Sequence, residues 1–178
     1  MTEKMQTELV EDALNGDIDS FGRLAARYYA SMVAVAYAVL ADHQLAEDAA
    51  QEAFARALTN LSKLRKPDKF APWLARICRN VARDMVASRA RMINPEDLSP
   101  APNCNSPDDD LEAVRRAIEH LPVGAREVIV LRYYNGLSYE EISSVLGISK
   151  QTINGRLTRA KRKIAKYLKR SGFLEDRL

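Results

Sequence analysis

Apolar residues recur every three or four positions through most of this chain, and no segment alternates apolar and polar residues as a β-strand does. The first stretch predicts a leading helix near residues 6–15, which ends at Asn15-Gly16. The next predicts a long helix capped at Asp19 or Ser20. Its inward stripe holds Phe21, Leu24, Ala25, Tyr28, Met32, Val35, Ala36 and Val39.

Two further helices complete the first block. One follows the "ADHQ" break and turns Leu45, Ala49, Ala53, Ala57 and Leu58 to one side. The other runs from Pro72, a favoured first-turn residue, to about Arg91. Its inward stripe is Trp73, Leu74, Ile77, Val81 and Met85.

The periodicity stops over residues 92–108, where "MINPEDLSPAPNCNSPD" holds four of the chain's seven prolines. Such composition is typical of a flexible, partly extended linker. The sequence therefore predicts an all-α protein in two small helical domains, residues 1–91 and 109–173, joined by this proline-rich linker.

The second block predicts a helix over "DDDLEAVRRAIEHL", a helix over "AREVIVLRYYNG" stopped by Asn135-Gly136, and then two helices joined by a tight turn. Ser138 and Glu141 have the spacing of a capping box, Gly147 makes the turn, and Ser149 caps the last helix. A short helix, a glycine turn and a second helix are typical of a helix-turn-helix.

The second helix of such a motif enters the DNA major groove with its N-terminal half. If Ile153, Leu157, Ala160 and Ile164 face inward, the outward residues include Lys150, Gln151, Asn154, Gly155, Thr158 and Arg159. Asn and Gln pair with adenine edges, and Arg with guanine or phosphate. Glycine within a helix costs about 1 kcal/mol against alanine. We interpret Gly155 as allowing close approach to DNA, the alternative being a weak spot tolerated by packing.

Charge is distributed unevenly, although the net charge is only +3. Residues 1–60 hold ten acids and four bases, whereas residues 150–170 hold nine bases and no acid. No apolar run approaches the roughly 20 residues of a membrane span. Cys78 and Cys104 match no metal or redox spacing, which favours reduced thiols and a cytoplasmic protein. We expect no metal, no cofactor and no insertion into a membrane.

Two helices of the first block carry candidate binding residues. Asp48, Gln51 and Glu52 share one helical flank, which is either a solvated polar face or a docking face for a basic partner. On the third helix, Arg76, Arg79, Asn80 and Arg83 surround the stripe that holds Trp73. Basic and aromatic residues together suit single-stranded nucleic acid, although a tryptophan is more often part of a core.

Three segments in this order resemble bacterial sigma factors of the extracytoplasmic-function (ECF) group, in the sigma-70 superfamily. They are "AEDAAQEAFARAL", "FAPWLARICRNVARD" and "LPVGAREVIVLRYYNGLSYEEISSVLGISKQTINGRLTRAKRKI", and the resemblance covers about residues 8–170. It implies that the first block is sigma domain 2 and the second is sigma domain 4.

The resemblance also implies roles for individual residues. Asp48, Gln51 and Glu52 match the face that binds core RNA polymerase, and residues 61–70 match the loop that pockets a flipped base. Arg76, Asn80 and Arg83 match the helix that touches the melted, single-stranded −10 element. Arg156 and Arg159 match basic positions of the helix that reads the double-stranded −35 element. The family more often has Lys or Arg at position 154 and Ser at 155, where this chain has Asn154 and Gly155.

The sequence therefore predicts a non-enzymatic promoter-specificity subunit of RNA polymerase, with an anti-sigma factor as a further partner. A DNA-binding regulator that uses the helix-turn-helix alone is a second hypothesis, but it leaves the Asp48 and Trp73 segments unexplained. A third is a helical enzyme using Glu47, Asp48 and Glu52, which no nucleophile, cofactor loop or ligand set supports.

Overall fold

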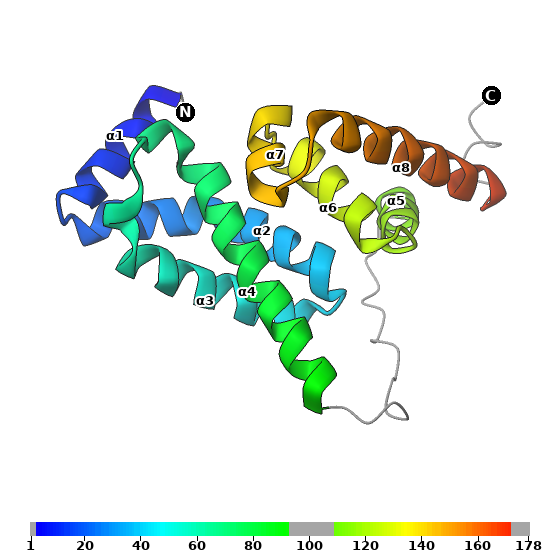
Figure 1. Ribbon diagram of the computed structural model, residues 1–178, viewed down its shortest axis with the longest axis horizontal. Helices are drawn as coiled ribbons and strands as arrows, with labels where there is room; N and C mark the ends of the chain where they lie inside the picture. The colour runs from blue at the N-terminus through cyan, green and yellow to red at the C-terminus, as the bar shows by residue number, and fades with distance from the viewer. Residues whose placement is uncertain (1–2, 93–108, 172–178) are drawn as a thin grey trace.

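The computed structural model describes residues 3–92 and 109–171, and within them every regular element is a helix (Figure 1). The all-α prediction is confirmed. An N-terminal bundle comprises residues 3–92 and a C-terminal bundle residues 109–171. The predicted linker, 92–108, falls almost wholly outside the described residues.

Four α-helices and two short 3₁₀ turns build the N-terminal bundle. They are α1 (Glu3–Leu14), α2 (Ile18–Leu40), α3 (His43–Thr59), η1 (Leu61–Lys63), η2 (Pro67–Lys69) and α4 (Phe70–Met92). The predicted cap of α2 at Asp19 or Ser20 was wrong, because Asp17 is the N-cap. Its carboxylate accepts hydrogen bonds from the Asp19 amide at 3.0 Å and the Ser20 hydroxyl at 2.7 Å, so both predicted caps lie inside the first turn.

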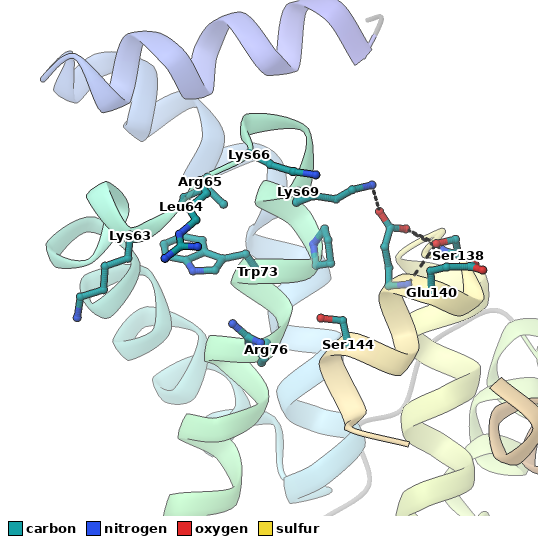
Figure 2. Close-up of a pocket in the computed structure, with 12 residues that line it drawn as sticks. Lys63, Leu64, Arg65, Lys66, Lys69, Trp73, Arg76, Ser138, Glu140 and Ser144 are labelled. Carbon is teal, nitrogen blue, oxygen red and sulfur yellow. Dashed lines mark hydrogen bonds and ion pairs between the residues drawn. The ribbon is translucent and has the colours of Figure 1, made fainter. Parts of the chain in front are cut away.

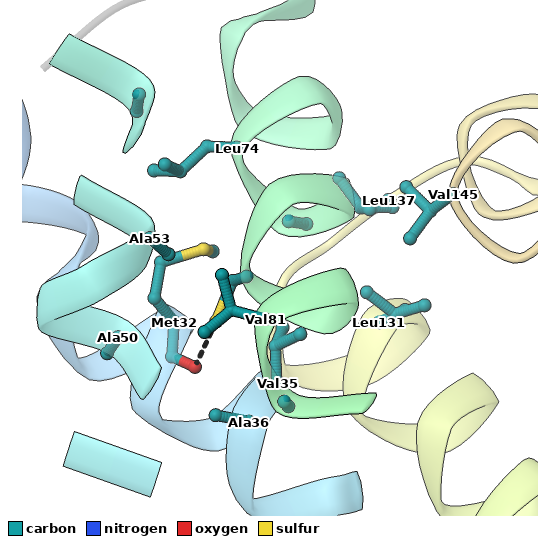
Figure 3. Packing of buried hydrophobic residues seen from close by; sticks show 14 of the residues in the cluster. Met32, Val35, Ala36, Ala50, Ala53, Leu74, Val81, Leu131, Leu137 and Val145 are labelled. Atoms are coloured by element: carbon teal, nitrogen blue, oxygen red, sulfur yellow. Dashed lines mark hydrogen bonds between the residues drawn. The ribbon is translucent and has the colours of Figure 1, made fainter. Parts of the chain in front are cut away.

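Alanines bring α3 close to its neighbours. Ala46, Ala49, Ala50, Ala53 and Ala57 are all buried. Their small side chains let α2 and α4 pack closely on the helix, where Met32, Leu74 and Val81 fill the space between (Figure 3). Leu58, predicted to face inward with them, is 42% exposed. It lies one residue beyond Ala57 and therefore about 100° around the helix.

The C-terminal bundle comprises α5 (Asp109–Glu119), α6 (Val123–Ile129), the π-helical turn η3 (Val130–Tyr134), α7 (Tyr139–Leu146) and α8 (Lys150–Arg170). The sequence predicted one uninterrupted helix through "AREVIVLRYYNG". Instead the hydrogen-bonding pattern widens after Ile129, and the Asn135 amide donates to the Val130 carbonyl at 3.0 Å. The helix thus ends in a π turn, a feature that periodicity does not reveal.

The helix-turn-helix forms as predicted from its caps. The Glu141 amide donates to the Ser138 hydroxyl at 3.3 Å, and the Glu141 carboxylate accepts from the Ser138 amide at 2.9 Å. Gly147 adopts a φ of 68°, the left-handed conformation that the turn requires. Ser149 then caps α8 by accepting from the Thr152 amide at 3.1 Å.

The two bundles pack against each other along α4. Leu131, Leu137 and Val145 of the C-terminal bundle lie against the side of α4 opposite α3 (Figure 3). Helix α7 contacts α4, and α6 contacts α2. The apolar core is therefore continuous between the bundles, and it fixes where their polar surfaces meet.

Candidate nucleic-acid interface

One flank of α4 presents the three predicted −10 residues together. Arg76, Asn80 and Arg83 follow one another at intervals of four and three residues, and all three are exposed. None of them has a hydrogen bond or ion pair within the described residues. Arg79 lies on a different side of α4 and is only 12% exposed. The flank therefore offers free donors to a partner.

A pocket of about 730 Å³ adjoins this flank, and we call it the basic pocket (Figure 2). Its walls from the N-terminal bundle are Lys63, Leu64, Arg65, Lys66, Lys69, Pro72, Trp73 and Arg76. Five of these side chains are cationic. The opposite wall comes from α7 and the turn before it, with Ser138, Glu140, Glu141 and Ser144. The predicted base-pocketing segment, residues 61–70, supplies most of the positive wall.

Trp73 forms part of both the core and the pocket. Its ring packs on Phe70 with the centroids 6.0 Å apart and the planes tilted by 43°. The residue is half-buried, and the rest of its side chain lines the basic pocket. The expected inward position is thus only partly confirmed, because Trp73 also lines the pocket.

Glu141 brings a negative charge into the basic pocket. The Lys69 ammonium donates to its carboxylate at 3.1 Å. Burial alone would raise the pKa of Glu141, but hydrogen bonds from Ser138 and Lys69 bring it below its usual range. The hydrogen bond to Glu141 in turn raises the pKa of Lys69. Both groups are therefore charged at neutral pH.

Most of the predicted −35 residues lie on the outer surface of α8. The exposed members of the set are Lys150, Gln151, Asn154, Thr158 and Arg159. Lys150 forms an ion pair with Glu140 of α7. The Arg159 guanidinium folds back to donate to the Gly155 carbonyl at 3.1 Å. Gln151, Asn154 and Thr158 are polar side chains pointing away from the core that Ile153 and Leu157 enter.

The remaining two predicted −35 residues, Gly155 and Arg156, are half-buried. The Arg156 guanidinium turns towards α6 and donates to the Gly124 carbonyl at 3.4 Å. A Cβ on Gly124 would lie 2.9 Å from that guanidinium, so the glycine leaves room for it. A Cβ on Gly155 would meet nothing closer than Arg159 at 3.8 Å. Packing within the chain therefore does not explain Gly155.

The acidic flank of α3 is separate in sequence from the basic residues of α4 and α8, and its charge is of the opposite sign. Asp48, Gln51 and Glu52 are all exposed. Glu52 accepts from Arg56 one turn later at 2.7 Å, in an ion pair whose side chains are about half exposed. The flank thus has the exposure that a docking surface needs. Among the described residues no group of three acidic, histidine or cysteine side chains could hold a metal ion.

Comparison with known proteins agrees with this layout. The family model described as Sigma-70 region 2 matches residues 24–92, and Sigma-70, region 4 matches residues 111–164. The RNA polymerase sigma-H factor of Pseudomonas aeruginosa is 31% identical over 185 residues, which cover 94% of this chain and 96% of that protein. This chain belongs to the extracytoplasmic-function group of sigma-70 factors.

Relatives of this sigma factor differ in length. The probable RNA polymerase sigma factor RfaY of Xanthomonas campestris pv. campestris is 35% identical over 161 residues, but the match spans only 40% of that protein. Among solved structures, CnrH in complex with the cytosolic domain of CnrY is 29% identical, with a TM-score of 0.68 over 92% of this chain and 97% of that one.

As a member of this group, the protein is an alternative sigma factor of transcription initiation. Sigma factors are generally non-enzymatic initiation factors. Within the described residues, no helix is both long and apolar enough to cross a membrane.

Sequence reasoning missed the residues that join the two bundles of this sigma factor. Arg79 was assigned to a polar surface, but its guanidinium donates to Glu127 of α6 at 2.6 Å. Glu127 and the neighbouring Arg126 are both buried. The two partners are 48 residues apart. No local pattern could have paired them, and only a charged pair within an otherwise apolar helix, Arg126-Glu127, gave a hint.

Proposed function

We propose that this sigma factor binds core RNA polymerase through the acidic flank of α3 and reads promoter DNA with α4 and α8. The observation that carries the proposal is the basic pocket beside Trp73, continuous with the free donors of the α4 flank. A single strand needs cations for its phosphates and an aromatic or arginine surface for its bases, and this pocket supplies both.

On α4, we assign the melted −10 element to Arg76, Asn80 and Arg83. Their exposure and lack of partners support a role in binding. The basic pocket next to them, with a volume of about 730 Å³, has room for an unstacked base. A base flipped out of the duplex costs a few kcal/mol, least where the duplex is already open.

On α8, we assign the double-stranded −35 element to the outward residues of its first half. Lys150, Gln151, Asn154, Thr158 and Arg159 combine amide, hydroxyl and cationic groups, as readers of major-groove edges do. Gly155 lies between them without a packing role, which supports close approach of the backbone. Arg156 faces α6, so we expect it to orient α8 as well as to contribute charge.

On α3, we assign docking to core polymerase to Asp48, Gln51 and Glu52. Their shared exposed flank suits a basic helical partner. We further propose that the protein acts in the cytoplasm, without enzymatic activity of its own, and that an anti-sigma factor controls it. A relative of 29% identity, CnrH, was solved with a domain of a second protein bound, which supports control by a partner.

Run-off transcription with purified core polymerase tests the proposal. The chain should direct specific initiation at promoters selected from genomic DNA, and core polymerase alone should not. Co-purification with core polymerase separates this function from that of a simple helix-turn-helix regulator. A regulator of that kind would bind duplex DNA but would not be retained by the polymerase.

Reversing charge at both Asp48 and Glu52 tests the docking flank. Single exposed ion pairs contribute about 0–1 kcal/mol, so the double variant is the informative one. We expect weaker capture by core polymerase with unchanged binding of duplex DNA. Capture at full strength would contradict the assignment of α3.

Replacing Arg76 and Asn80 with alanine tests the α4 flank. Both side chains are exposed and unpaired, so the fold should be unaffected. We expect slower promoter opening with little change in the initial binding of duplex DNA, measured by permanganate reactivity of unpaired thymines. Normal melting in both variants would remove α4 from the single-strand assignment.

A further inference from the structure

The C-terminal half of α8 borders a pocket that the proposed function does not use. Helix α5 packs against α8, and the last turns of α8 and the residue after α5 line a pocket of about 560 Å³. We call it the α5–α8 pocket. Sites for small molecules in proteins have volumes of about 300–1,000 Å³, so this one has room for a single ligand of that kind. Its lining residues are His120, Lys163, Lys166, Tyr167, Arg170 and Ser171.

Three cations form one wall of the α5–α8 pocket. Lys163, Lys166 and Arg170 follow one another at intervals of three and four residues, so they share one flank of α8. All three are exposed, and none has a hydrogen bond or ion pair within the described residues. Residues 150–170 contain no acid, so no side chain of α8 neutralises them. The wall therefore attracts anions, and phosphate is the anion that Lys and Arg commonly bind.

An aromatic pair forms a second wall. The His120 ring packs on the Tyr167 ring, with the centroids 4.9 Å apart and the planes tilted by 39°. The Arg116 carbonyl accepts from Nδ1 of His120 at 2.7 Å, which fixes the orientation of the imidazole. His120 is exposed and Tyr167 is half-buried, so the pair offers aromatic surface to the pocket that it lines. Aromatic side chains of this kind stack on nucleic-acid bases.

The combination of the two walls favours a nucleotide over other anions. A DNA duplex keeps its bases stacked inside, so it could meet the cations but not the aromatic pair. A single strand offers unpaired bases, but its sites on proteins extend over about 4–16 nucleotides, whereas this pocket has one aromatic pair and room for one small ligand. A mononucleotide with a phosphate chain uses both walls at once.

The α5–α8 pocket can be tested separately from the −35 surface. Arg156 and Arg159 line a neighbouring pocket between α6 and α8, and Lys163 is the one residue common to the two. The other side chains of the α5–α8 pocket belong to no set assigned to promoter DNA or core polymerase. Substitutions at positions 120, 166 and 170 therefore change this pocket and leave the proposed promoter contacts in place.

We propose that the α5–α8 pocket binds a nucleoside di- or triphosphate, with the phosphates on the three cations and the base against His120. This site goes beyond the proposed function, which needs only core polymerase, promoter DNA and an anti-sigma factor. It gives the sigma factor a small-molecule ligand within its own C-terminal bundle.

Titration of the full chain with ADP and with GDP, followed by NMR, tests the cationic wall. A salt concentration of about 0.15 M screens non-specific attraction between exposed charges. Amides at the end of α5 and in the last turns of α8 should shift and saturate. Single exposed ion pairs contribute little, so the informative variant is Lys166→Ala with Arg170→Ala, which should weaken binding about tenfold. Lys169→Ala removes the same charge from the same helix outside the pocket, and affinity should stay nearly unchanged.

His120→Ala tests the aromatic wall. A base stacked on an aromatic side chain should account for about fivefold or more of the affinity, so this variant should weaken binding of ADP by that factor. Binding of inorganic pyrophosphate should not change, because pyrophosphate has no base. Circular dichroism should show full helicity, since His120 is exposed.

Absence of saturable binding at millimolar ADP and GDP would overturn the proposal. Equal affinities for ADP and pyrophosphate, both insensitive to His120→Ala, would reduce the pocket to a site for an adventitious ion only. Tighter binding of oligothymidine through the same residues would assign the pocket to a single strand instead. Equal losses for Lys169→Ala and Lys166→Ala would reduce the effect to net charge. None of these readouts uses polymerase or promoter DNA, so their failure is distinct from a failure of the proposed function.

Discussion

Helices α4 and α8 both carry basic residues to a surface proposed for DNA, but they are held in different ways. Helix α4 lies between neighbours, with α2 and α3 on one side and α7 on the other. Its buried residues include Phe70, Leu74, Ala75, Cys78, Val81 and Ala82. Helix α8 buries only Ile153, Leu157 and Ala160, none of them beyond the middle of the helix.

This difference indicates how many positions of each helix tolerate substitution. Many positions on α4 belong to packing or to the contact between the bundles, so changes that spare the fold are confined to its exposed positions, such as Arg76, Asn80 and Arg83. On α8 a single narrow apolar stripe suffices, and the outer surface can vary. Substitutions in α4 should therefore act mainly through stability, and substitutions in α8 mainly through DNA binding.

The largest effect is expected from Leu74→Ala in α4. Leu74 is fully buried, and removing a buried leucine side chain costs about 2–5 kcal/mol. Urea unfolding should show the loss directly. Lys169→Ala, on the exposed surface of α8, should leave the free energy of unfolding nearly unchanged. Equal losses for the two variants would break the comparison.

A smaller, binding-specific effect is expected from Arg159→Ala in α8. A lost base contact should cost about 1–3 kcal/mol at one promoter position and relax preference there. A lost phosphate contact should instead lower the log–log salt dependence of binding by roughly one unit. Titrating promoter duplexes at several salt concentrations separates the two. Stability should not change, because Arg159 contacts only its own helix.

Arg156→Ala provides the matched comparison on the same helix. Its guanidinium contacts the Gly124 carbonyl of α6, so truncation should lower stability as well as binding. If the two arginine variants behave alike in urea, the contact with Gly124 has no measurable role in holding α8.

A still smaller effect on stability is expected from Gly155→Ala. An alanine fits, since its Cβ would meet nothing closer than Arg159 at 3.8 Å. The helix should gain up to about 1 kcal/mol. If the glycine permits close approach to DNA, −35 binding should weaken, and Gly155→Leu should weaken it more with the fold intact. A higher melting temperature with unchanged promoter binding would show that Gly155 is only a tolerated weak point.

The smallest effect concerns the pKa of Tyr37, which lies at the contact between the bundles. Burial, with the hydrogen bond to Glu119, raises the pKa of Tyr37 to about 12. An unfolded tyrosine ionises near pH 10. The contribution of Tyr37 to stability is therefore complete below about pH 10 and lost as the pH rises through about 12. Burial also raises the pKa of Tyr28, so ultraviolet titration should show late-ionising tyrosine absorbance that Tyr37→Phe reduces but does not abolish. A Tyr37 that ionises near pH 10 would contradict the contact.

Local patterns predicted the helices and most of their ends. The capping box at Ser138, the turn at Gly147 and the cap at Ser149 each depend on residues within four positions, so the sequence displays them directly. The start of α2 was misplaced because three candidate caps, at positions 17, 19 and 20, follow one another. The π turn after Ile129 was missed because its apolar spacing matches that of an ordinary helix.

Long-range contacts could not be predicted in this way. The period of a helix tells which side is buried but not which charged group from another helix will face it. Arg79 was therefore assigned to a polar surface although it pairs with Glu127, and Arg156, matched to a −35 position by resemblance, turns towards Gly124. The assignment of polymerase and DNA contacts to particular residues stays a prediction, supported by exposure and awaiting the variants above.

The buried thiol of Cys78 can serve as a probe of local opening in the N-terminal bundle. It is fully buried, it donates to the Met32 carbonyl at 3.2 Å, and burial raises its pKa to about 12. A thiol reagent reacts with the thiolate, so at neutral pH the folded protein should be almost inert at this position. The rate at which a reagent labels Cys78 therefore reports how often the N-terminal bundle opens and exposes this thiol. The time course of that reaction would report how often α4 separates from α2, with and without a partner bound.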